Sequence, residues 1–190
     1  MKKRILIFIS IIVSAFYVVR LYTLNSKEHF PIILEYDNNQ EVEFENDFFD
    51  YSEENMNGYS ITLTNSELMT IDEFISNYAI QDKEIFHPFN YVCLLKVNVK
   101  NKSNKDEEKS GLNLKHFMLQ SGAYMTYPNT DAFAYVNDID FMQFSLRYNS
   151  DKDFIIPFLI YNGNVDINTF KKMSPQLVVS LFPHKKVIKI

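Results

Sequence analysis

The stretch NYVCLLKVNVKNKS, residues 90–103, constrains the fold of this chain more than any other feature. Successive side chains of a β-strand point to opposite faces, and this stretch alternates with that period. One face is apolar (Tyr91, Cys93, Leu95, Val97 and Val99), whereas the later part of the other carries Lys96, Asn98 and Lys100. Because its first half is apolar on both faces, we predict a strand that begins inside the domain and ends at a polar turn over residues 101–111.

The same period of two recurs along most of the chain. Alternation around Val42 and Phe44, and again over residues 59–64, is typical of half-buried strands. Further strands are predicted at residues 116–120, 141–148, 154–161, 176–182 and 186–190. The sequence NSDKD, residues 149–153, predicts a turn that joins two of them in a hairpin.

Two features refine this β-rich pattern. Pro157 has no amide hydrogen for a sheet ladder, so its strand should lie at an edge or contain a bulge. Residues 70–73 have the pattern of a helix capping box, and a second short helix is predicted over residues 166–172. About seven short strands with one or two short helices predict a mostly β domain, an antiparallel β-sandwich.

The N-terminal segment differs from the rest of the chain. Lys2, Lys3 and Arg4 precede a run, Ile5–Leu24, whose 20 residues are broken only by few polar side chains and Arg20. A helix of that length spans about 30 Å, the thickness of a bilayer's hydrocarbon core. We therefore predict a signal anchor over residues 1–25 that contacts lipid through residues 5–24, with its N-terminus in the cytoplasm.

Two alternatives to an uncleaved anchor are open. A cleaved signal peptide needs small residues after the apolar run, but the exit over residues 17–19 is bulky. A soluble amphipathic helix needs one apolar stripe, whereas this run is apolar on all sides. The anchor predicts a single-pass protein of the cell membrane whose residues 26–190 form one extracytoplasmic domain.

The charge of that domain is acidic. After residue 29 the chain carries 14 basic and 23 acidic side chains, and no Lys or Arg lies between Lys27 and Lys83. Such a balance disfavours binding to nucleic acid or to an anionic lipid surface. With a single cysteine the domain has no internal disulfide, so burial and backbone pairing must stabilise it.

The sequence contains no local catalytic or metal-binding motif. Cys93 lies within the predicted strand and reads as a small buried hydrophobe rather than a nucleophile. The four histidines, His29, His87, His116 and His184, lack the spacing of a helical metal site. We predict a protein that is not an enzyme, with no catalytic, cofactor-binding or metal-ligating residue and no cofactor.

An acidic segment over residues 35–54 supplies the alternative prediction. Its carboxylates could hold calcium or a small ligand, although the spacing is not that of an EF-hand. Glu41, Glu43 and Glu45 should share the solvent face of one strand, which keeps a sheet edge soluble. The aromatic residues at positions 48, 49 and 51 predict either a contact loop or a cap over one end of the domain.

Four strand segments carry a resemblance to a known group of proteins: VCLLKVNVKNKS, HFMLQSG, FIIPFLIY and PQLVVSLFPHKKVIKI. Over residues 85–190 the chain resembles small exported, membrane-anchored or lipid-anchored proteins of low-GC Gram-positive bacteria, a family with no assigned activity. The resemblance implies an immunoglobulin-like (telokin-like) β-sandwich. The chain departs from the lipid-anchored members because no cysteine follows its apolar run.

Together these features predict a membrane-anchored, non-catalytic module that binds a protein or peptide partner outside the cell. Envelope protection, immunity or sensing are the processes that suit such a module, by analogy of fold alone. The expected contacts are sheet edges and the aromatic, acidic segment around Phe48.

Overall fold

The computed structural model describes residues 2–25, 32–50, 54–86, 89–105, 111–161, 163 and 166–190. The chain divides into two compact units, residues 1–31 and residues 32–190. The first contains one helix, and the second contains eleven strands and three α-helices within the described residues.

The helix of the first unit, α1, runs from Lys2 to Asn25 and confirms the helical conformation expected for this segment. Consecutive apolar side chains of α1 are exposed, for example Ile11 at 61%, Ile12 at 44% and Val13 at 62%. Since neighbouring residues of a helix point about 100° apart, its exposed apolar surface is not confined to one stripe. Among the described residues, no helix is both long enough and apolar enough to cross a membrane.

The second unit contains a four-stranded antiparallel sheet in the order β2-β3-β4-β9. Its strands are β2 (Glu41–Glu43), β3 (Tyr59–Thr70), β4 (Tyr91–Asn101) and β9 (Ser150–Ile160). β4 is the strand predicted from the alternating stretch, and it pairs along its whole length with β3 and β9. β9 contains Pro157 and lies at the edge of the sheet, as its missing amide hydrogen requires.

A five-stranded sheet has the order β1-β11-β10-β6-β7. Its strands are β1 (Ile33–Tyr36), β6 (Met118–Ser121), β7 (Tyr124–Thr126), β10 (Gln176–Ser180) and β11 (Lys185–Lys189). β1 pairs in parallel with β11, whereas the other pairs are antiparallel. Two further strands, β5 (Leu112–Asn113) and β8 (Gln143–Phe144), form a small antiparallel pair.

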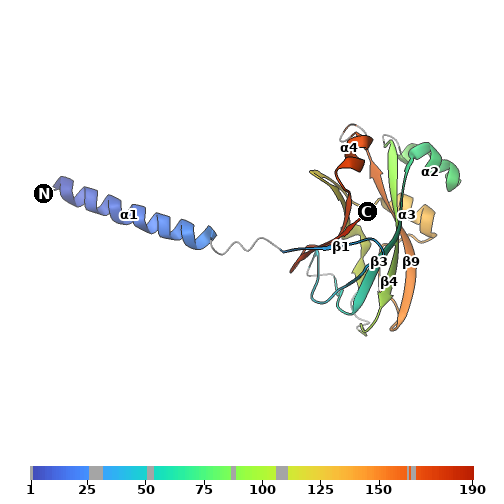
Figure 1. Cartoon of the computed structure of the whole chain (residues 1–190), viewed down its shortest axis with the longest axis horizontal. Coiled ribbons are helices and arrows are strands. Elements are labelled where there is room, and N and C mark those ends of the chain that lie inside the picture. Colours follow the sequence, from blue (N-terminus) through green and yellow to red (C-terminus); the bar gives the residue numbers. More distant parts are fainter. Residues whose placement is uncertain are drawn as a thin grey trace. The chain divides into compact units, whose positions relative to one another are not determined.

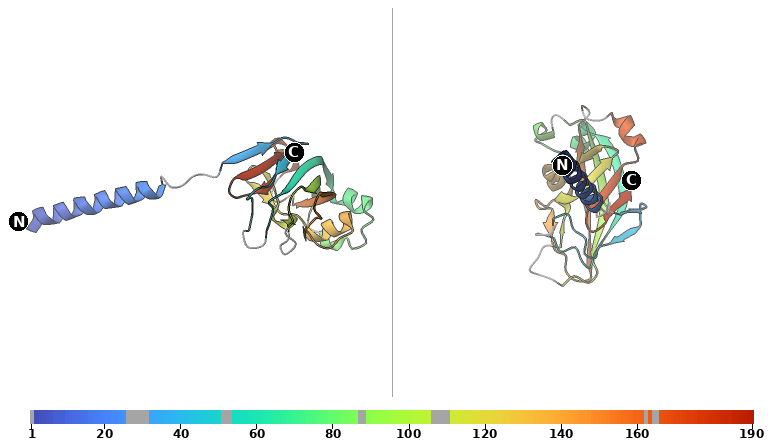
Figure 2. Two further views of the ribbon diagram at one scale, coloured as in Figure 1. Left: turned by 90° about the horizontal axis from the view of Figure 1, so that it is seen from below. Right: turned by 90° about the vertical axis from the view of Figure 1, so that its left-hand side faces the viewer.

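The two larger sheets share one hydrophobic core. Ile61, Leu95 and Val97 from the four-stranded sheet belong to the same buried cluster as Leu177 and Ile188 from the five-stranded sheet. Figure 1 and Figure 2 show the two sets of strands around this core, with the C-terminal strands beside β1. Alternate residues of β3 and β4 therefore pack inward, which confirms the period-two pattern read from the sequence.

The opposite face of the four-stranded sheet is covered by helices, which explains why β4 begins apolar on both faces. Val92, Leu94 and Leu159 form a second buried cluster with side chains of the helical segments, among them Phe74 and Ala132. Those segments are α2 (Ile71–Asn77), the 3₁₀ turn η1 (Glu84–Phe86) and α3 (Thr130–Asn137). Figure 1 shows α2 and α3 on the side of β4 and β9 away from β1.

The structure corrects the predicted number and pairing of strands. Eleven strands occur among the described residues instead of about seven, because six of them have only two to four residues, too few for a clear alternating pattern. The parallel pairing of β1 with β11 makes the five-stranded sheet mixed rather than antiparallel. β6 also begins later than predicted, at Met118, because residues 114–116 form the 3₁₀ turn η2.

Of the strand predicted over residues 141–148, only β8 forms. The predicted hairpin between this strand and β9 is wrong, because β8 pairs with β5 and β9 pairs with β4. The Tyr59 hydroxyl accepts a hydrogen bond from the Leu146 amide at 3.0 Å, and the Asn101 side chain donates to the Leu146 carbonyl at 2.7 Å. Side chains thus replace the sheet partners of this segment. Asn149 adopts a left-handed conformation (φ 55°) in the turn that leads directly into β9, which pairs with β4.

Three α-helices are present in this unit where one or two were expected. α2 and α4 (Ile167–Lys172) match the two predicted helices, and α3 has no counterpart among the predicted elements. Asn129 caps α3 by accepting a hydrogen bond from the Ala132 amide at 2.8 Å. Asn is a common N-cap residue, so this local signal was visible in the sequence.

Replacing Thr70 by alanine is expected to lower the free energy of unfolding by about 1 kcal/mol, the usual value of an N-cap. The Thr70 hydroxyl accepts from the Glu73 amide at 3.2 Å, and the Glu73 carboxylate accepts from the Thr70 amide at 2.8 Å. Urea unfolding of the two proteins measures the difference. Ser76→Ala, at an exposed position of the same helix, is the control and should match the wild type; equal stability of all three proteins would contradict the capping role.

Candidate functional site

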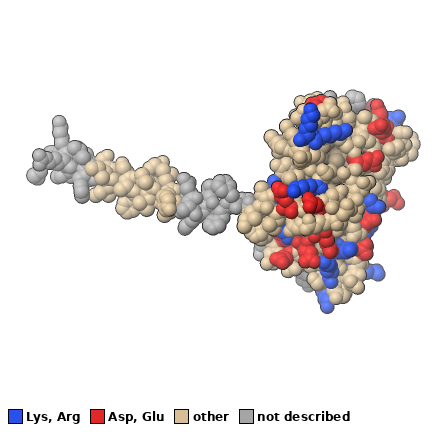
Figure 3. Space-filling model, viewed as in Figure 1, with Lys and Arg blue, Asp and Glu red and all other residues tan. Residues whose placement is uncertain are grey.

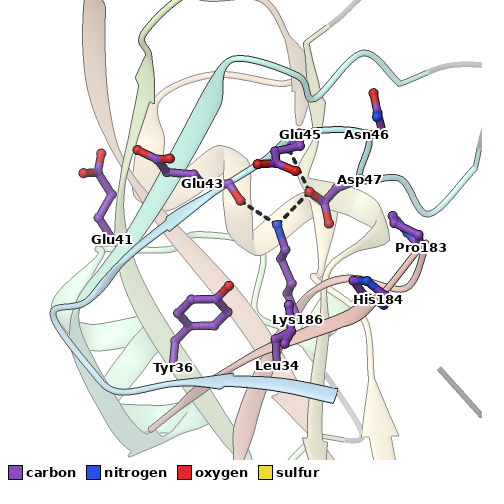
Figure 4. Close-up of a pocket in the computed structure, with 10 residues that line it drawn as sticks. All are labelled: Leu34, Tyr36, Glu41, Glu43, Glu45, Asn46, Asp47, Pro183, His184 and Lys186. Carbon is purple, nitrogen blue, oxygen red and sulfur yellow. Dashed lines mark hydrogen bonds and ion pairs between the residues drawn. The ribbon is translucent and has the colours of Figure 1, made fainter. Parts of the chain in front are cut away.

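An open hollow of about 480 Å³ lies where the acidic segment meets the last strand of the chain. Its walls come from β1, from β2 and the residues that follow it, and from the turn that leads into β11. Figure 4 shows the ten lining residues: Leu34, Tyr36, Glu41, Glu43, Glu45, Asn46, Asp47, Pro183, His184 and Lys186. Its volume is in the range of small-molecule and side-chain binding sites.

A buried ion pair lies at the base of the hollow. Lys186 shares a face of β11 with the core residue Ile188, because side chains two apart on a strand point the same way. Its Nζ lies 2.7 Å from Asp47 Oδ2 and donates to the Glu43 carbonyl at 2.6 Å. The two side chains are only 9% and 3% exposed, so the ion pair is shielded from water.

Two buried polar atoms of residues that line the hollow have no hydrogen-bond partner among the described residues. Asp47 Oδ2 accepts hydrogen bonds from Lys186 and from the Glu45 amide at 2.8 Å, whereas Asp47 Oδ1 has no hydrogen-bond partner among the described residues. His184 Nδ1 is likewise buried without one. Because most buried polar atoms in proteins are hydrogen-bonded, two exceptions in the lining of one hollow indicate a place where a polar group can be received.

The acidic wall of the hollow is only partly neutralised. Lys102 Nζ lies 2.6 Å from Glu43 and 3.2 Å from Glu41. The Ser60 hydroxyl donates to Glu41 at 2.6 Å, and this bond, with the Lys102 ammonium, lowers the pKa of Glu41. Glu45 forms no ion pair with any described residue, so the lining has a net negative charge.

More generally, the acidic segment pairs with basic residues from the second half of the chain. Beyond the pairs with Lys102 and Lys186, Lys189 Nζ lies 3.0 Å from the Glu35 carboxylate. Figure 3 shows acidic atoms gathered around a few basic ones on the viewed face. Glu41, Glu43 and Glu45 are exposed while Val42 and Phe44 are buried, so the predicted solvent face is confirmed.

Phe48 and Phe182 are adjacent in sequence to Asp47 and Pro183, two residues that line the hollow. Phe48 forms an isolated antiparallel bridge with Phe182, and their rings stack at 5.3 Å between centroids. Phe49 packs against the main core and lies 5.8 Å from the Phe117 ring. Phe49 therefore has the capping position that was predicted for this segment. Phe182, the partner of Phe48, is 49% exposed. Tyr51 lies outside the described residues.

The structure also brings His116 to Glu54, a contact that no local motif indicates. His116 Nδ1 and Glu54 Oε1 are 2.6 Å apart, and the Glu54 side chain is 1% exposed. Glu54 Oε2 accepts a hydrogen bond from the Phe49 amide at 2.6 Å. The Glu54 carboxylate therefore connects the acidic segment to His116. His29 and His87 lie outside the described residues.

Among the described residues, no three His, Cys, Asp or Glu side chains are arranged to hold a metal ion. Among the described residues, the calcium alternative for residues 35–54 therefore has no ligand set. Sequence reasoning named this segment but missed the ion pair of Asp47 with Lys186. The available signal was the pattern KKVIKI, in which Lys186 shares a strand face with the apolar Ile188.

Cys93 is a buried core residue, 3% exposed, as the sequence predicted. Burial raises the pKa of its thiol to about 12, so the reactive thiolate is scarce near neutral pH. We expect iodoacetamide at pH 8 to leave the native protein unmodified and to alkylate it fully in denaturant, as measured by intact mass. Rapid alkylation of the native protein would contradict the buried position.

The fold and this hollow define a mostly β protein with an acidic, partly buried surface site. Residues 33–186 match the family described as "Domain of unknown function (DUF5028)", and the chain belongs to that family. This confirms the predicted resemblance to a domain without assigned activity. A Gram-positive origin and an immunoglobulin-like topology remain predictions.

A solved structure, "The crystal structure of a functionally unknown protein from Listeria monocytogenes EGD-e", is similar to this chain. The match has 13% sequence identity and a TM-score of 0.41, and it covers 65% of this chain. It spans 66% of the other chain, slightly under two thirds of its length. Comparison with curated proteins found no match.

Proposed function

We propose that this chain is a non-catalytic binding module that receives a protein or peptide partner at the acidic hollow. The observation that carries the proposal is a pair of buried atoms, Asp47 Oδ1 and His184 Nδ1, that have no hydrogen-bond partner in the described part of the chain and belong to residues lining an open hollow. The stacked rings of Phe48 and Phe182 follow and precede lining residues of the hollow in the sequence, and they offer an apolar contact. Aromatic residues beside a polar site are typical of protein interfaces.

A photocrosslinking experiment tests this proposal. A benzophenone amino acid replaces Asn46, which is exposed and lines the hollow, in the full chain produced in its host cells. We expect a discrete crosslinked adduct that disappears when Glu45→Lys is added, because charge reversal repels the partner. The same amino acid at Glu84, an exposed position on η1, is the control and should give no such adduct. Adducts that are equal at both positions, or unaffected by Glu45→Lys, would refute the proposal.

The proposal includes an immunoglobulin-like sandwich displayed outside the cell and tethered by α1. The shared core of the two larger sheets supports the sandwich, and the apolar run of the sequence over residues 5–24 supports a tether that contacts lipid. Arg20 lies near the outer end of the helix, where a long cationic side chain can reach the head groups. Envelope protection, immunity or sensing would each use a module in this position.

Reporter fusions test the location. A phosphatase that is active only outside the cytoplasm, fused after Ile190, should be active, and the full chain should require detergent for extraction from membranes. Replacing Val13 and Phe16 by aspartate should release the protein from the membrane fraction, because charged side chains are costly in lipid. A fusion that is active only in the cytoplasm would contradict the tethered, outward-facing arrangement.

A further inference from the structure

We propose that the acidic hollow binds the side-chain ammonium group of a lysine on a partner peptide, an inference that rests on the proposed function. The net charge of the lining is the first argument. Glu41 and Glu43 share one cation, Lys102, and Asp47 is paired with Lys186, while Glu45 has no ionic partner among the described residues. The site therefore lacks positive charge and favours a cationic group.

The partnerless atoms select a hydrogen-bond donor. A carboxylate oxygen such as Asp47 Oδ1 only accepts, and His184 Nδ1 accepts in the tautomer that carries its proton on Nε2. An ammonium group has three donors and no acceptor, so its hydrogen-bonding capacity suits acceptor atoms of this kind. Asp47 can hold two cations because Lys186 uses only Oδ2.

The rest of the lining suits the stem of a lysine. Leu34, Tyr36 and Pro183 give the hollow an apolar side, and Figure 4 shows the side chains of Leu34 and Tyr36 on the opposite side from the acidic residues. A lysine buries its four-carbon stem on such a surface while its charged end reaches polar groups. A hollow of about 480 Å³ is large enough for one such side chain with its peptide backbone.

Entry of the ammonium group requires a small adjustment. Asp47 Oδ1 and His184 Nδ1 are shielded from solvent, although their residues line the hollow. Glu45 and His184 both line the hollow, so we expect one of these side chains to turn when the ligand binds. Nuclear magnetic resonance signals of the His184 ring then report binding at this position.

Calorimetric titration of the full chain in detergent, at physiological ionic strength, tests the proposal with hexalysine as the probe. We expect binding that Glu45→Gln weakens about threefold to tenfold, the effect of removing one charge-assisted contact. Glu84→Gln removes the same charge from the exposed position on η1 and should change the affinity less than twofold. Hexalysine with acetylated side chains should not bind. Asp47→Asn should weaken binding at least as much as Glu45→Gln if its thermal unfolding shows a folded protein.

The remaining outcomes decide against the proposal. Absence of hexalysine binding, or equal weakening by Glu45→Gln and Glu84→Gln, overturns it, and spermidine binding as tightly as hexalysine overturns the peptide as the source of the ammonium group. If hexalysine fails while the crosslink at position 46 still depends on Glu45, the proposed function stands and only the lysine chemistry is wrong. If hexalysine binds at Glu45 but no crosslink forms, the ligand chemistry stands and the partner protein does not.

Discussion

Replacing Lys186 by methionine is expected to lower the free energy of unfolding by about 3–5 kcal/mol, the usual cost of leaving one partner of a buried ion pair unpaired. In the wild type the Lys186 ammonium contacts Asp47 Oδ2 at 2.7 Å and the Glu43 carbonyl at 2.6 Å. Its removal leaves the Asp47 carboxylate, 3% exposed, without its counter-charge. Urea unfolding followed by circular dichroism measures the loss.

Two further variants separate the ion pair from a general effect of lysine removal. Lys186→Met combined with Asp47→Leu should regain most of the stability, because apolar residues can replace a buried pair without an unpaired charge. Lys189→Met removes an exposed lysine of the same strand, β11, which is paired with Glu35 of β1, and its unfolding midpoint should equal that of the wild type. A destabilisation by Lys189→Met equal to that by Lys186→Met would contradict the special position of Lys186.

Phe158→Ala is expected to lower the free energy of unfolding by about 3–5 kcal/mol, as large-to-small changes of buried aromatic residues do. Phe158 lies on the edge strand β9, opposite Cys93 of β4, and its side chain is fully buried in the core shared by the two larger sheets. Truncation removes its contacts with both sheets and leaves a cavity between them. Thermal and urea unfolding measure the effect.

Phe141→Ala is the matched control for Phe158→Ala. Phe141 is 60% exposed, so its truncation should change stability by less than about 0.5 kcal/mol. If both variants lost similar stability, the result would contradict the buried position of Phe158 in the shared core. If neither did, the shared core would not be the main source of stability in this disulfide-free domain.

Local signals in the sequence were sufficient for the elements that they encode directly. The second half of β4 alternates clearly, its first half is apolar on both faces, and the whole strand pairs with long neighbours on both sides. The capping box at Thr70 and Glu73 likewise lies within four residues, so α2 could be placed closely. The burial of Cys93 followed from its position on the apolar face of the strand.

Contacts between distant segments could not be predicted in the same way. The parallel pairing of β1 with β11 joins residues 33–36 to residues 185–188, and four residues carry too little pattern to indicate a partner. The segment around Leu146 has a strand-like pattern, but hydrogen bonds from Tyr59 and Asn101 take the place of a ladder. Such side-chain competition becomes visible only in the folded chain.

The candidate site shows the same division. The sequence proposed the acidic segment as a candidate contact region, yet the geometry of the segment depends on partners far along the chain. Lys186 is 139 positions from Asp47, and His116 is 62 positions from Glu54. The sequence alone suggests that the Asp47 carboxylate is exposed to solvent. In the fold, Lys186 of β11 lies beside this carboxylate, and the two form a buried ion pair.

Residue-specific mapping of the hexalysine contact on the isotope-labelled full chain tests the central claim most directly. Backbone amide chemical shifts are followed during the titration. The largest changes should occur within residues 34–47 and 183–186, the ranges that contain the residues lining the hollow, together with a change at the His184 ring. Largest changes around α2 and η1, or shifts spread evenly over the acidic surface, would contradict the assignment of this hollow as the binding site.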